Sequence, residues 1–520
     1  MGSAPPPSNA PTPPEPDSTP EPRRRRLNLF HVALPICAVV GVGGIAFPES
    51  LASGAGAITG ATFEALDWYY MGVVSACVIL AGWLAFGRYG NLRLGGPDEQ
   101  PEFSYAAWLS MLFAAGMGVG LLFWGVAEPM MHFASPPTGV GGTPEAARRA
   151  MVLTNMHWGL QAWSIYAMGA LVLGYFAFRR GTPYLPGAPI RDVFRGRWVE
   201  PVARLADLVA VLAVAFGVAG SIAMGVLQFH TGLSVVTDVP AQSMTVRVVL
   251  LVVLFISYMT SAATSLDKGI KWLSQINITL ALVLMFFVLM AGPTADLMRG
   301  FVTALGDYLT ELPGLALTTY PYVDKSGWFH GWTLVYFVWW IAWTPFVGIF
   351  IARISRGRTV REFLVCVVLV PTLFSILWFA IFGGTAFHEE MTHGGVSQLV
   401  NENVTVALFS LFERLPLSST LSWISLMLVF VFLVTSVDSA TYVLGMLTSR
   451  GSMDPPVGRK LGWGISLAVL GGALMVAERI DVVRAVSILG ALPFTLVLLL
   501  QISALLKAMR RDAVNGEGNR

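Results

Sequence analysis

The sequence predicts an all-α, polytopic membrane protein, and three observations support this fold class. The 520 residues are 55% hydrophobic and only 12% charged, whereas soluble proteins carry about 25% charged residues. Apolar runs of about 20 residues, long enough to cross a bilayer as helices, recur along the chain. Basic residues are also divided unevenly between alternate loops, as in proteins with many membrane spans.

Twelve transmembrane helices are predicted from these runs. In chain order they cover residues 29–49, 68–87, 105–127, 155–177, 205–229, 246–264, 271–292, 332–352, 362–385, 419–446, 460–477 and 482–506. An even number puts both termini on one side, and the loops of that side hold most of the Arg and Lys. The positive-inside rule therefore predicts that both termini are cytoplasmic.

The ends of the chain and one internal segment do not read as spans. Residues 1–27 are rich in Pro and end in arginines, which predicts a disordered cytoplasmic tail. Residues 28–507 form the predicted membrane domain, and 508–520 a short cytoplasmic tail. Residues 294–320 alternate charged and apolar positions at helical spacing, which predicts an amphipathic helix on the outer surface, with a packing role favoured over a functional one.

Net charge and cysteines exclude several function classes. The net charge is +2, so bulk charge indicates no nucleic-acid partner. The three cysteines, all in apolar runs and without a Cys-x-x-Cys or His pairing, indicate neither a disulfide framework nor a zinc site. The histidines form no His-Glu-x-x-His pair, so a membrane-embedded enzyme is disfavoured, and no sequence of the carbonyl-filter kind indicates a channel.

The third span has a run of glycines in the sequence Phe113-Ala-Ala-Gly-Met-Gly-Val-Gly120. Each glycine destabilises a helix by about 1 kcal/mol. One interpretation is close helix packing through Gly116 and Gly120. The other is an unwound midpoint, because broken helices at membrane depth line cavities and expose backbone groups that bind carboxylates and cations.

The eighth span has a second predicted interruption, at Pro345 with Gly348. Two irregular helices, five spans apart, are typical of transporters built from inverted repeats. This pairing predicts one repeat over about 105–292 and a second over about 332–506, preceded by two extra helices.

Aromatic residues gather at membrane depth in the same eighth span. Trp339, Trp340 and Trp343 share one face at helical spacing. A concave cluster of indoles suits a quaternary ammonium, because the ring quadrupole attracts a cation that has no N–H to donate. Lipid-facing or helix-packing aromatics are the alternative. In the fourth span, Trp158 and Tyr166 lie close to one helical face.

The tenth span carries Thr435, Ser436 and Asp438. An ionisable residue in an apolar helix indicates a functional site, and the two hydroxyls with nearby carbonyls form a set of hard oxygen ligands suited to sodium. Hydrogen bonding of these hydroxyls to their own helix is the alternative, and it needs no ion.

Together these stretches resemble the betaine/choline/carnitine transporter family over roughly residues 28–507. The run GWTLVYFVWWIAWTPFVGIFIARISRGRTVREF is similar to the family's signature in its eighth span, and FAAGMGVGLLFWGVAEP to its Gly-rich third span. MHWGLQAWSIY and VTSVDSATY resemble its fourth and tenth spans. The resemblance implies a LeuT-type fold, a homotrimer and a location in the bacterial inner membrane.

The resemblance also implies the site residues. An aromatic box for trimethylammonium would comprise Trp158, Trp163, Tyr166 and Trp340, with Trp339, Trp343 and Phe350 along the path inward. The substrate carboxylate would meet the backbone of Ala115, Gly116, Met117 and Gly118. A sodium ion would lie on carbonyls of Ala114, Met117 and Phe432 and on hydroxyls of Thr435 and Ser436.

Three departures from the family pattern bear on substrate and coupling. Gly120 stands where choline-specific members often carry Asp, which favours a zwitterion such as glycine betaine. Val214 and Val218 replace two threonines of a second sodium site, so that site is expected to be lost or altered. The short tail after residue 507 disfavours osmotic activation through a long charged extension.

The sequence thus predicts a non-enzymatic secondary transporter that imports a quaternary-ammonium osmolyte by alternating access, with sodium as coupling ion and no other cofactor. Proton-coupled choline uptake, or sodium-independent exchange of carnitine or betaine, is the alternative in the same fold. The substrate, the ion stoichiometry and the regulation stay open at this point.

Overall fold

The computed structural model describes residues 28–116, 118–264, 267–323, 325–477 and 480–517. Within these ranges all regular elements are helices, and a single antiparallel bridge joins Arg93 to Thr359 between two loops. The predicted tail 1–27 and Met117 of the predicted site lie outside the described residues. The all-helical part of the fold prediction is therefore confirmed for the part of the chain described.

The helices have the following bounds. They are α1 (Leu29–Ala46), α2 (Pro48–Phe86), α3 (Tyr105–Gly116), α4 (Val119–Ala134), α5 (Pro144–Trp158), α6 (Leu160–Arg180), α7 (Ala188–Val193), α8 (Val199–Val236), α9 (Met244–Thr264), α10 (Asp267–Ala291), α11 (Thr294–Leu315), α12 (Ser326–Phe329), the π-helical turn η1 (His330–Leu334), α13 (Val335–Ile354), α14 (Val360–His393), α15 (Val396–Glu402), the 3₁₀ turn η2 (Val404–Val406), α16 (Ala407–Phe412), α17 (Ser418–Thr448), α18 (Val457–Val476), α19 (Ile480–Leu489) and α20 (Phe494–Glu517).

Many of these helices can cross a membrane. Among the described residues nine helical segments are long and apolar enough, or up to eleven if each of two bent pairs forms one span. One of these bent pairs corresponds to the last predicted span. Its two helical parts, Val482–Leu489 and Phe494–Asp512, meet at an angle of 42°. This confirms a multi-pass membrane protein, whereas the number twelve and the inverted repeat remain predictions.

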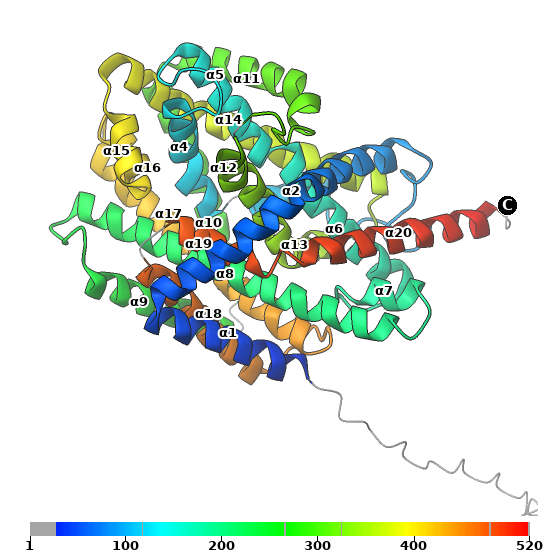
Figure 1. Cartoon of the computed structure of the whole chain (residues 1–520). Helices are drawn as coiled ribbons and strands as arrows, with labels where there is room; N and C mark the ends of the chain where they lie inside the picture. The colour runs from blue at the N-terminus through cyan, green and yellow to red at the C-terminus, as the bar shows by residue number, and fades with distance from the viewer. Residues whose placement is uncertain (1–27, 117, 265–266, 324, 478–479, 518–520) are drawn as a thin grey trace, which may run out of the picture.

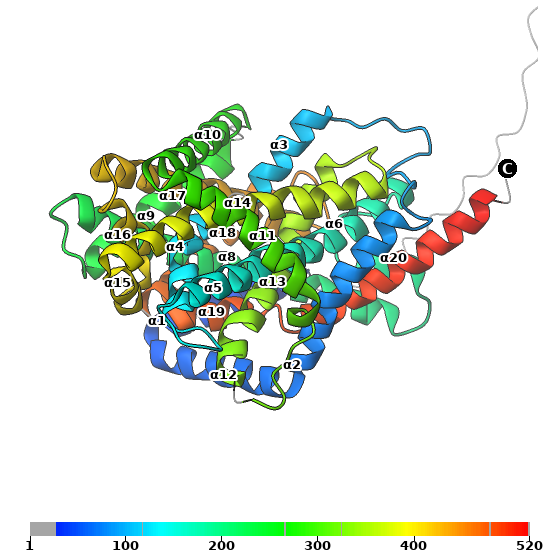
Figure 2. The same ribbon diagram turned by 90° about the horizontal axis from the view of Figure 1, so that it is seen from above.

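The most enclosed helices are α6 and α8, while α1 and α9 lie at the periphery. α6 packs along α13, and α8 packs against α17 and α18 (Figures 1 and 2). Apolar side chains cover α8 on all sides, as expected for a helix buried in a bundle. The helices that carry the predicted site, α6, α13 and α17, therefore surround the middle of the molecule.

α11 turns sharply away from the helix before it, at 112° to the segment Gln275–Ala291. Its charged face holds α5 through Asp307, which pairs with Arg148 at 2.7 Å, and through the ion pair of Glu311 with Arg149. Its opposite face leaves Val302 and Leu309 exposed. The amphipathic helix expected over 294–320 is thus present, and it packs on its own chain.

Two membrane helices are broken at glycines. α3 ends at Gly116 and α4 begins at Val119, with Gly118 extended between them at φ −154° and ψ 176°. Similarly, α5 and α6 meet at Gly159, whose φ and ψ are −99° and −134°. The first break matches the unwound midpoint, which was one of the two interpretations of the glycine run, whereas the second was not predicted.

The eighth span is irregular at a different place from the one predicted. α13 continues through Pro345 and Gly348, so the predicted interruption there is wrong. Gly348 instead lets α13 approach the backbone of α6, since an added Cβ would lie 3.3 Å from the nitrogen of Ala170. The irregular part is the π-helical turn η1, which lies directly before α13.

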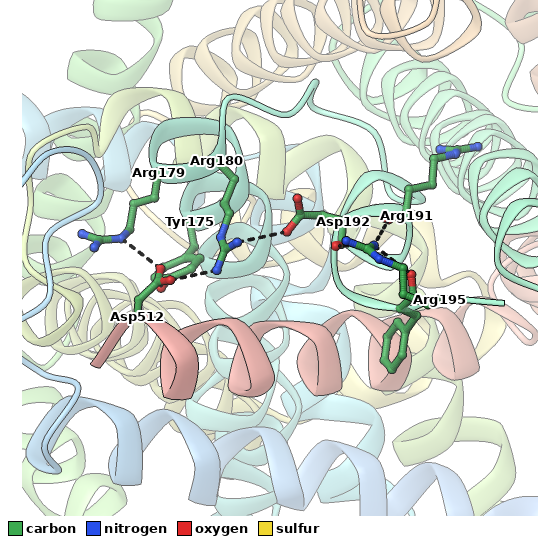
Figure 3. A network of polar contacts seen from close by, with 8 residues as sticks. Tyr175, Arg179, Arg180, Arg191, Asp192, Arg195 and Asp512 are labelled. Atoms are coloured by element: carbon green, nitrogen blue, oxygen red, sulfur yellow. Dashed lines mark hydrogen bonds and ion pairs between the residues drawn. The ribbon is translucent and has the colours of Figure 1, made fainter. Parts of the chain in front are cut away.

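A polar cluster fixes the end of α6 to the C-terminal helix (Figure 3). Asp512 on α20 accepts hydrogen bonds from Tyr175 at 2.6 Å and from Arg180 at 2.8 Å. Arg180 also lies 3.6 Å from Asp192 on α7. Because α6 carries part of the predicted aromatic box at its other end, these bonds anchor a helix that lines the site.

Candidate functional site

The helices enclose a cavity of about 1060 Å³. Its inner end is lined by Gly118 and Gly120 and by aromatic rings, and its outer part reaches the loops of Arg356 and Asp454 and the start of α18 at Lys460. Those loops belong to the side on which the sequence concentrates its basic residues. The cavity therefore leads from the middle of the bundle to the face predicted to be cytoplasmic.

Four aromatic rings meet at the inner end of this cavity. Trp340 on α13 lies 5.3 Å from Trp158, 5.0 Å from Tyr166 and 6.2 Å from Trp163, between ring centroids. Most of these pairs are edge-to-face, so ring faces and edges of several side chains converge on one place. All four line the cavity. The structure thus brings together the four residues expected to form the aromatic box.

The remaining predicted aromatic residues lie further along the cavity. Trp339, Trp343 and Phe350 all line it, as does Phe346. Phe350 is 40% exposed, which shows how open the cavity is at this level. These side chains form the walls of a passage between the box and the basic loops.

The broken helix contributes backbone to the same cavity. Ala115 and Gly116 form the end of α3, and Gly118 caps the start of α4 with an extended conformation. Gly118 and Gly120 line the cavity. A Cβ at Gly120 would lie 3.1 Å from the indole of Trp158, so a side chain at this position would press on the box.

The described residues include all of the predicted sodium ligands except Met117. Ala114 lies near the end of α3, and Phe432, Thr435 and Ser436 on α17 line the cavity. The hydroxyl of Thr435 donates to the carbonyl oxygen of Val431 at 2.9 Å, and it also lies 3.2 Å from the carbonyl oxygen of Phe432. Hard oxygen atoms suited to sodium are thus present, but the Thr435 hydroxyl also has the helical partner expected under the alternative interpretation.

The two valines that were expected to alter a second sodium site are buried. Val214 and Val218 on α8 are each 1% exposed. Neither side chain carries an oxygen, so these positions offer no hydroxyl to a cation.

A buried polar cluster beside the box was missed by the sequence analysis. Glu128, His132 and His157 are at most 1% exposed. Glu128 accepts a hydrogen bond from the indole N–H of Trp158 at 2.7 Å, and its other oxygen lies 2.6 Å from Nδ1 of His157. The histidines form no His-Glu-x-x-His pair in the sequence, and Glu128 lies one residue past the predicted third span.

The wide mouth of the cavity is polar. Burial raises the pKa of Tyr184 to about 12, although Arg353 and Arg356 act in the opposite direction. The backbone N–H of Gly96 donates to Glu99, and this bond, together with Arg356, holds the pKa of the Glu99 carboxyl below its usual range. Arg356, which lines the cavity, is therefore paired with the carboxylate of Glu99.

Comparison with known proteins identifies the family. The family model for betaine/carnitine/choline transporters matches residues 28–514. The chain belongs to the betaine/carnitine/choline transporter family. It is consequently related to transporters, and not to enzymes.

Individual relatives of this family differ in what they carry. The chain is 38% identical to the glycine betaine transporter OpuD of Bacillus subtilis, over 93% of this chain and 94% of that protein. It is 37% identical to an ectoine/hydroxyectoine transporter of Virgibacillus pantothenticus, over 94% and 97%. It is also 37% identical to the osmo-independent choline transporter BetT1 of Acinetobacter baylyi, over 91% of each chain. Overall identity therefore does not separate these substrates.

Proposed function

We propose that this chain is a secondary active transporter that imports a quaternary-ammonium zwitterion, with glycine betaine as substrate and an osmoprotective role. The observation that carries the proposal is the convergence of Trp158, Trp163, Tyr166 and Trp340 at the closed end of a cavity. Desolvated cation–π contacts are worth roughly 0.5–2 kcal/mol each, so several rings together can hold a trimethylammonium group that makes no hydrogen bonds.

The other end of the zwitterion has a suitable partner in the broken helix. The first N–H groups of α4, directly after Gly118, have no partner within the helix and carry the positive end of its dipole. A carboxylate placed there would be stabilised without any basic side chain. The separation of an aromatic box from a helix N-terminus fits a small molecule with a cation at one end and an anion at the other.

Sodium is the proposed coupling ion. Its proposed ligands are oxygen atoms of Ala114, Met117, Phe432, Thr435 and Ser436. When bound, a sodium ion would link the end of α3, beside the break, to α17, since both helices contribute oxygen atoms to this set. The chain's own contribution is to hold α17 against the cavity so that Ser436 and the carbonyl of Phe432 face it. Alternating access between an outward-open and an inward-open state completes the proposed cycle.

The same proposal places the protein in a bacterial inner membrane, as a homotrimer with both termini cytoplasmic. The basic loops around the cavity mouth support this orientation. The exposed apolar residues of α11 leave a surface that a lipid or a second subunit could cover.

Choline is the second candidate substrate, carried with protons or by sodium-independent exchange. It is favoured by the choline transporter among the relatives. The helical partners of Thr435 and the valines at 214 and 218 favour coupling without sodium.

Uptake of labelled glycine betaine into proteoliposomes tests the proposal. A sodium gradient, a proton gradient or neither is imposed, and unlabelled choline and carnitine are added as competitors. We expect uptake driven by sodium. Uptake driven only by protons would overturn the coupling ion, and choline uptake without betaine uptake would overturn the substrate.

A further inference from the structure

We propose that Glu128 positions the aromatic box. Its carboxylate holds the indole of Trp158 and also the side chain of His157, whose backbone carbonyl accepts a hydrogen bond from Trp340. Glu128 is completely buried and lies behind Trp158, so it acts through the box and does not touch the ligand. The proposal rests on the proposed function for the nature of the ligand, but its geometry does not depend on the ligand.

A continuous chain of hydrogen bonds supports this role. One oxygen of Glu128 accepts from Nε1 of Trp158 at 2.7 Å, and the other lies 2.6 Å from Nδ1 of His157. Nε2 of His157 lies 3.0 Å from the hydroxyl of Thr333. The backbone carbonyl of His157 accepts from Nε1 of Trp340 at 2.8 Å. Two of the four rings are thus fixed by groups that converge on Glu128.

The protonation pattern follows from the donors and acceptors present. An ionised carboxylate only accepts hydrogen bonds, so Nδ1 of His157 carries a proton. In a neutral imidazole Nε2 is then an acceptor, and the hydroxyl of Thr333 donates to it. Each side-chain group in the chain therefore has a complementary partner, which makes the arrangement specific for one orientation of Trp158.

The backbone at Trp158 explains why a side-chain bond is needed there. Trp158 is the last residue of α5, and Gly159 breaks the helix directly after it. The ring consequently cannot depend on a continuing helix for its direction. The other side of the break is fixed separately, because the hydroxyl of Tyr308 accepts from the N–H of Leu160 and donates to Gln161.

A carboxylate at 128 can be compared with an amide of the same shape. Glutamine keeps one carbonyl oxygen for Trp158, and its NH₂ can donate to Nδ1 of His157 after a change of tautomer. Alanine removes both bonds and leaves the indole N–H of Trp158 and Nδ1 of His157 without these partners in a buried place. Glu128→Gln should therefore preserve the box, while Glu128→Ala should disturb it.

The first measurement uses the full-length protein labelled with 5-fluorotryptophan and observed by ¹⁹F NMR. The line of Trp158 is identified by its loss in Trp158→Phe. We expect Glu128→Ala to move this line and Glu128→Gln to leave it close to its original place. Glu390→Ala, which removes a carboxylate at the end of α14 that accepts from the N–H groups of Val396 and Ser397 at the start of α15, should not move it.

The second measurement is equilibrium binding of labelled glycine betaine, and of choline, to the same purified variants. Glu128→Ala and Trp158→Phe should each raise Kd about tenfold, as for loss of a buried hydrogen bond. The double variant should raise Kd by less than the product of the two single effects, because both changes remove the bond between Glu128 and Trp158. Glu128→Gln should bind almost as well as the original protein.

The outcomes separate this proposal from the proposed function. An unmoved Trp158 line in Glu128→Ala, or fully additive effects in the double variant, would overturn the positioning role. If the unaltered protein binds neither betaine nor choline while the Trp158 line still responds to Glu128→Ala, the positioning role stands and the proposed substrate class is wrong.

Discussion

The two sides of the aromatic box are built differently. On one side, the ring of Trp340 lines a cavity that continues past Phe346 and Phe350 to a polar mouth. On the other side lies a packed layer in which Arg484 sits 4.3 Å from the Trp124 ring and 4.4 Å from the Trp332 ring. One side therefore admits a solute, while the other is closed by stacked aromatic rings and a cation.

The closed side is held by contacts that could be exchanged in another state. His157 stacks on Tyr336 at 4.9 Å with an interplanar angle of 10°, and His132 lies 4.4 Å from Trp332. Such side-chain contacts can separate without unfolding any helix. Under the proposed mechanism, this asymmetry corresponds to a state open to the basic face, and transport requires the closed layer to open when the cavity shuts.

Chemical access should show the largest difference between the two sides. Phe350→Cys places a thiol on the exposed wall of the cavity, whereas Thr333→Cys places one in the closed layer, where Thr333 is 2% exposed. The three native cysteines are buried, so their background reaction should be small. With a small hydrophilic maleimide, the thiol at 350 should react and the thiol at 333 should not. Equal labelling would show that the closed layer opens freely.

A side chain at Gly120 should weaken binding strongly, because its Cβ would lie 3.1 Å from Trp158. Overpacking of this kind destabilises by about 1–3 kcal/mol. Since Trp158 is part of the box, Gly120→Ala should raise the Michaelis constant for betaine about tenfold. Gly306→Ala, where a Cβ meets open space, is the control. An unchanged constant would mean that Trp158 does not shape the ligand site.

Removal of the α17 hydroxyls should abolish the response to sodium while leaving the box intact. Thr435→Ala combined with Ser436→Ala should give betaine uptake that no longer increases with a sodium gradient. Ser439→Ala is the matched control, because Ser439 lies on the same helix and lines the same cavity. Sodium stimulation that survives the double change would place the ion elsewhere.

The anchor between α6 and α20 should contribute least. Asp512→Asn keeps one acceptor for Tyr175 but removes the charge that faces Arg180. Partly exposed ion pairs contribute up to about 1 kcal/mol, so the melting temperature should fall by about 2 °C or less. Arg511→Gln, a change at an exposed neighbour, should have no effect. A large loss of stability would assign the C-terminal helix a greater structural role.

The sequence was most informative where a residue type has few other uses at membrane depth. The glycine run around Gly118 allowed either close helix packing or a broken third span, and the structure has the break, because so many glycines in one helix are costly. The tryptophans of the eighth span predicted rings that line a cavity. Spacing placed Trp158 and Tyr166 close to one helical face, but they lie on separate helices, α5 and α6, and both rings instead contact Trp340.

Other features depended on tertiary contacts that periodicity does not carry. A single glycine such as Gly159 occurs in many continuous helices, so nothing local marked the second break. Pro345 was expected to interrupt its helix, but α13 continues through it. Glu128 and His157 lie 29 residues apart in the sequence, and only the packing of α4 against α5 brings them together.

The central claim is that the open side of the box holds the ligand, and equilibrium binding tests it most directly. Labelled glycine betaine is titrated onto the purified protein, onto Trp340→Leu and onto Trp332→Leu, which removes an indole from the closed layer. We predict that Trp340→Leu raises Kd about tenfold or more, since it removes the ring shared by the box contacts, while Trp332→Leu changes Kd much less. Equal effects of the two changes, or unaltered binding in Trp340→Leu, would contradict the assignment of the box as the substrate site.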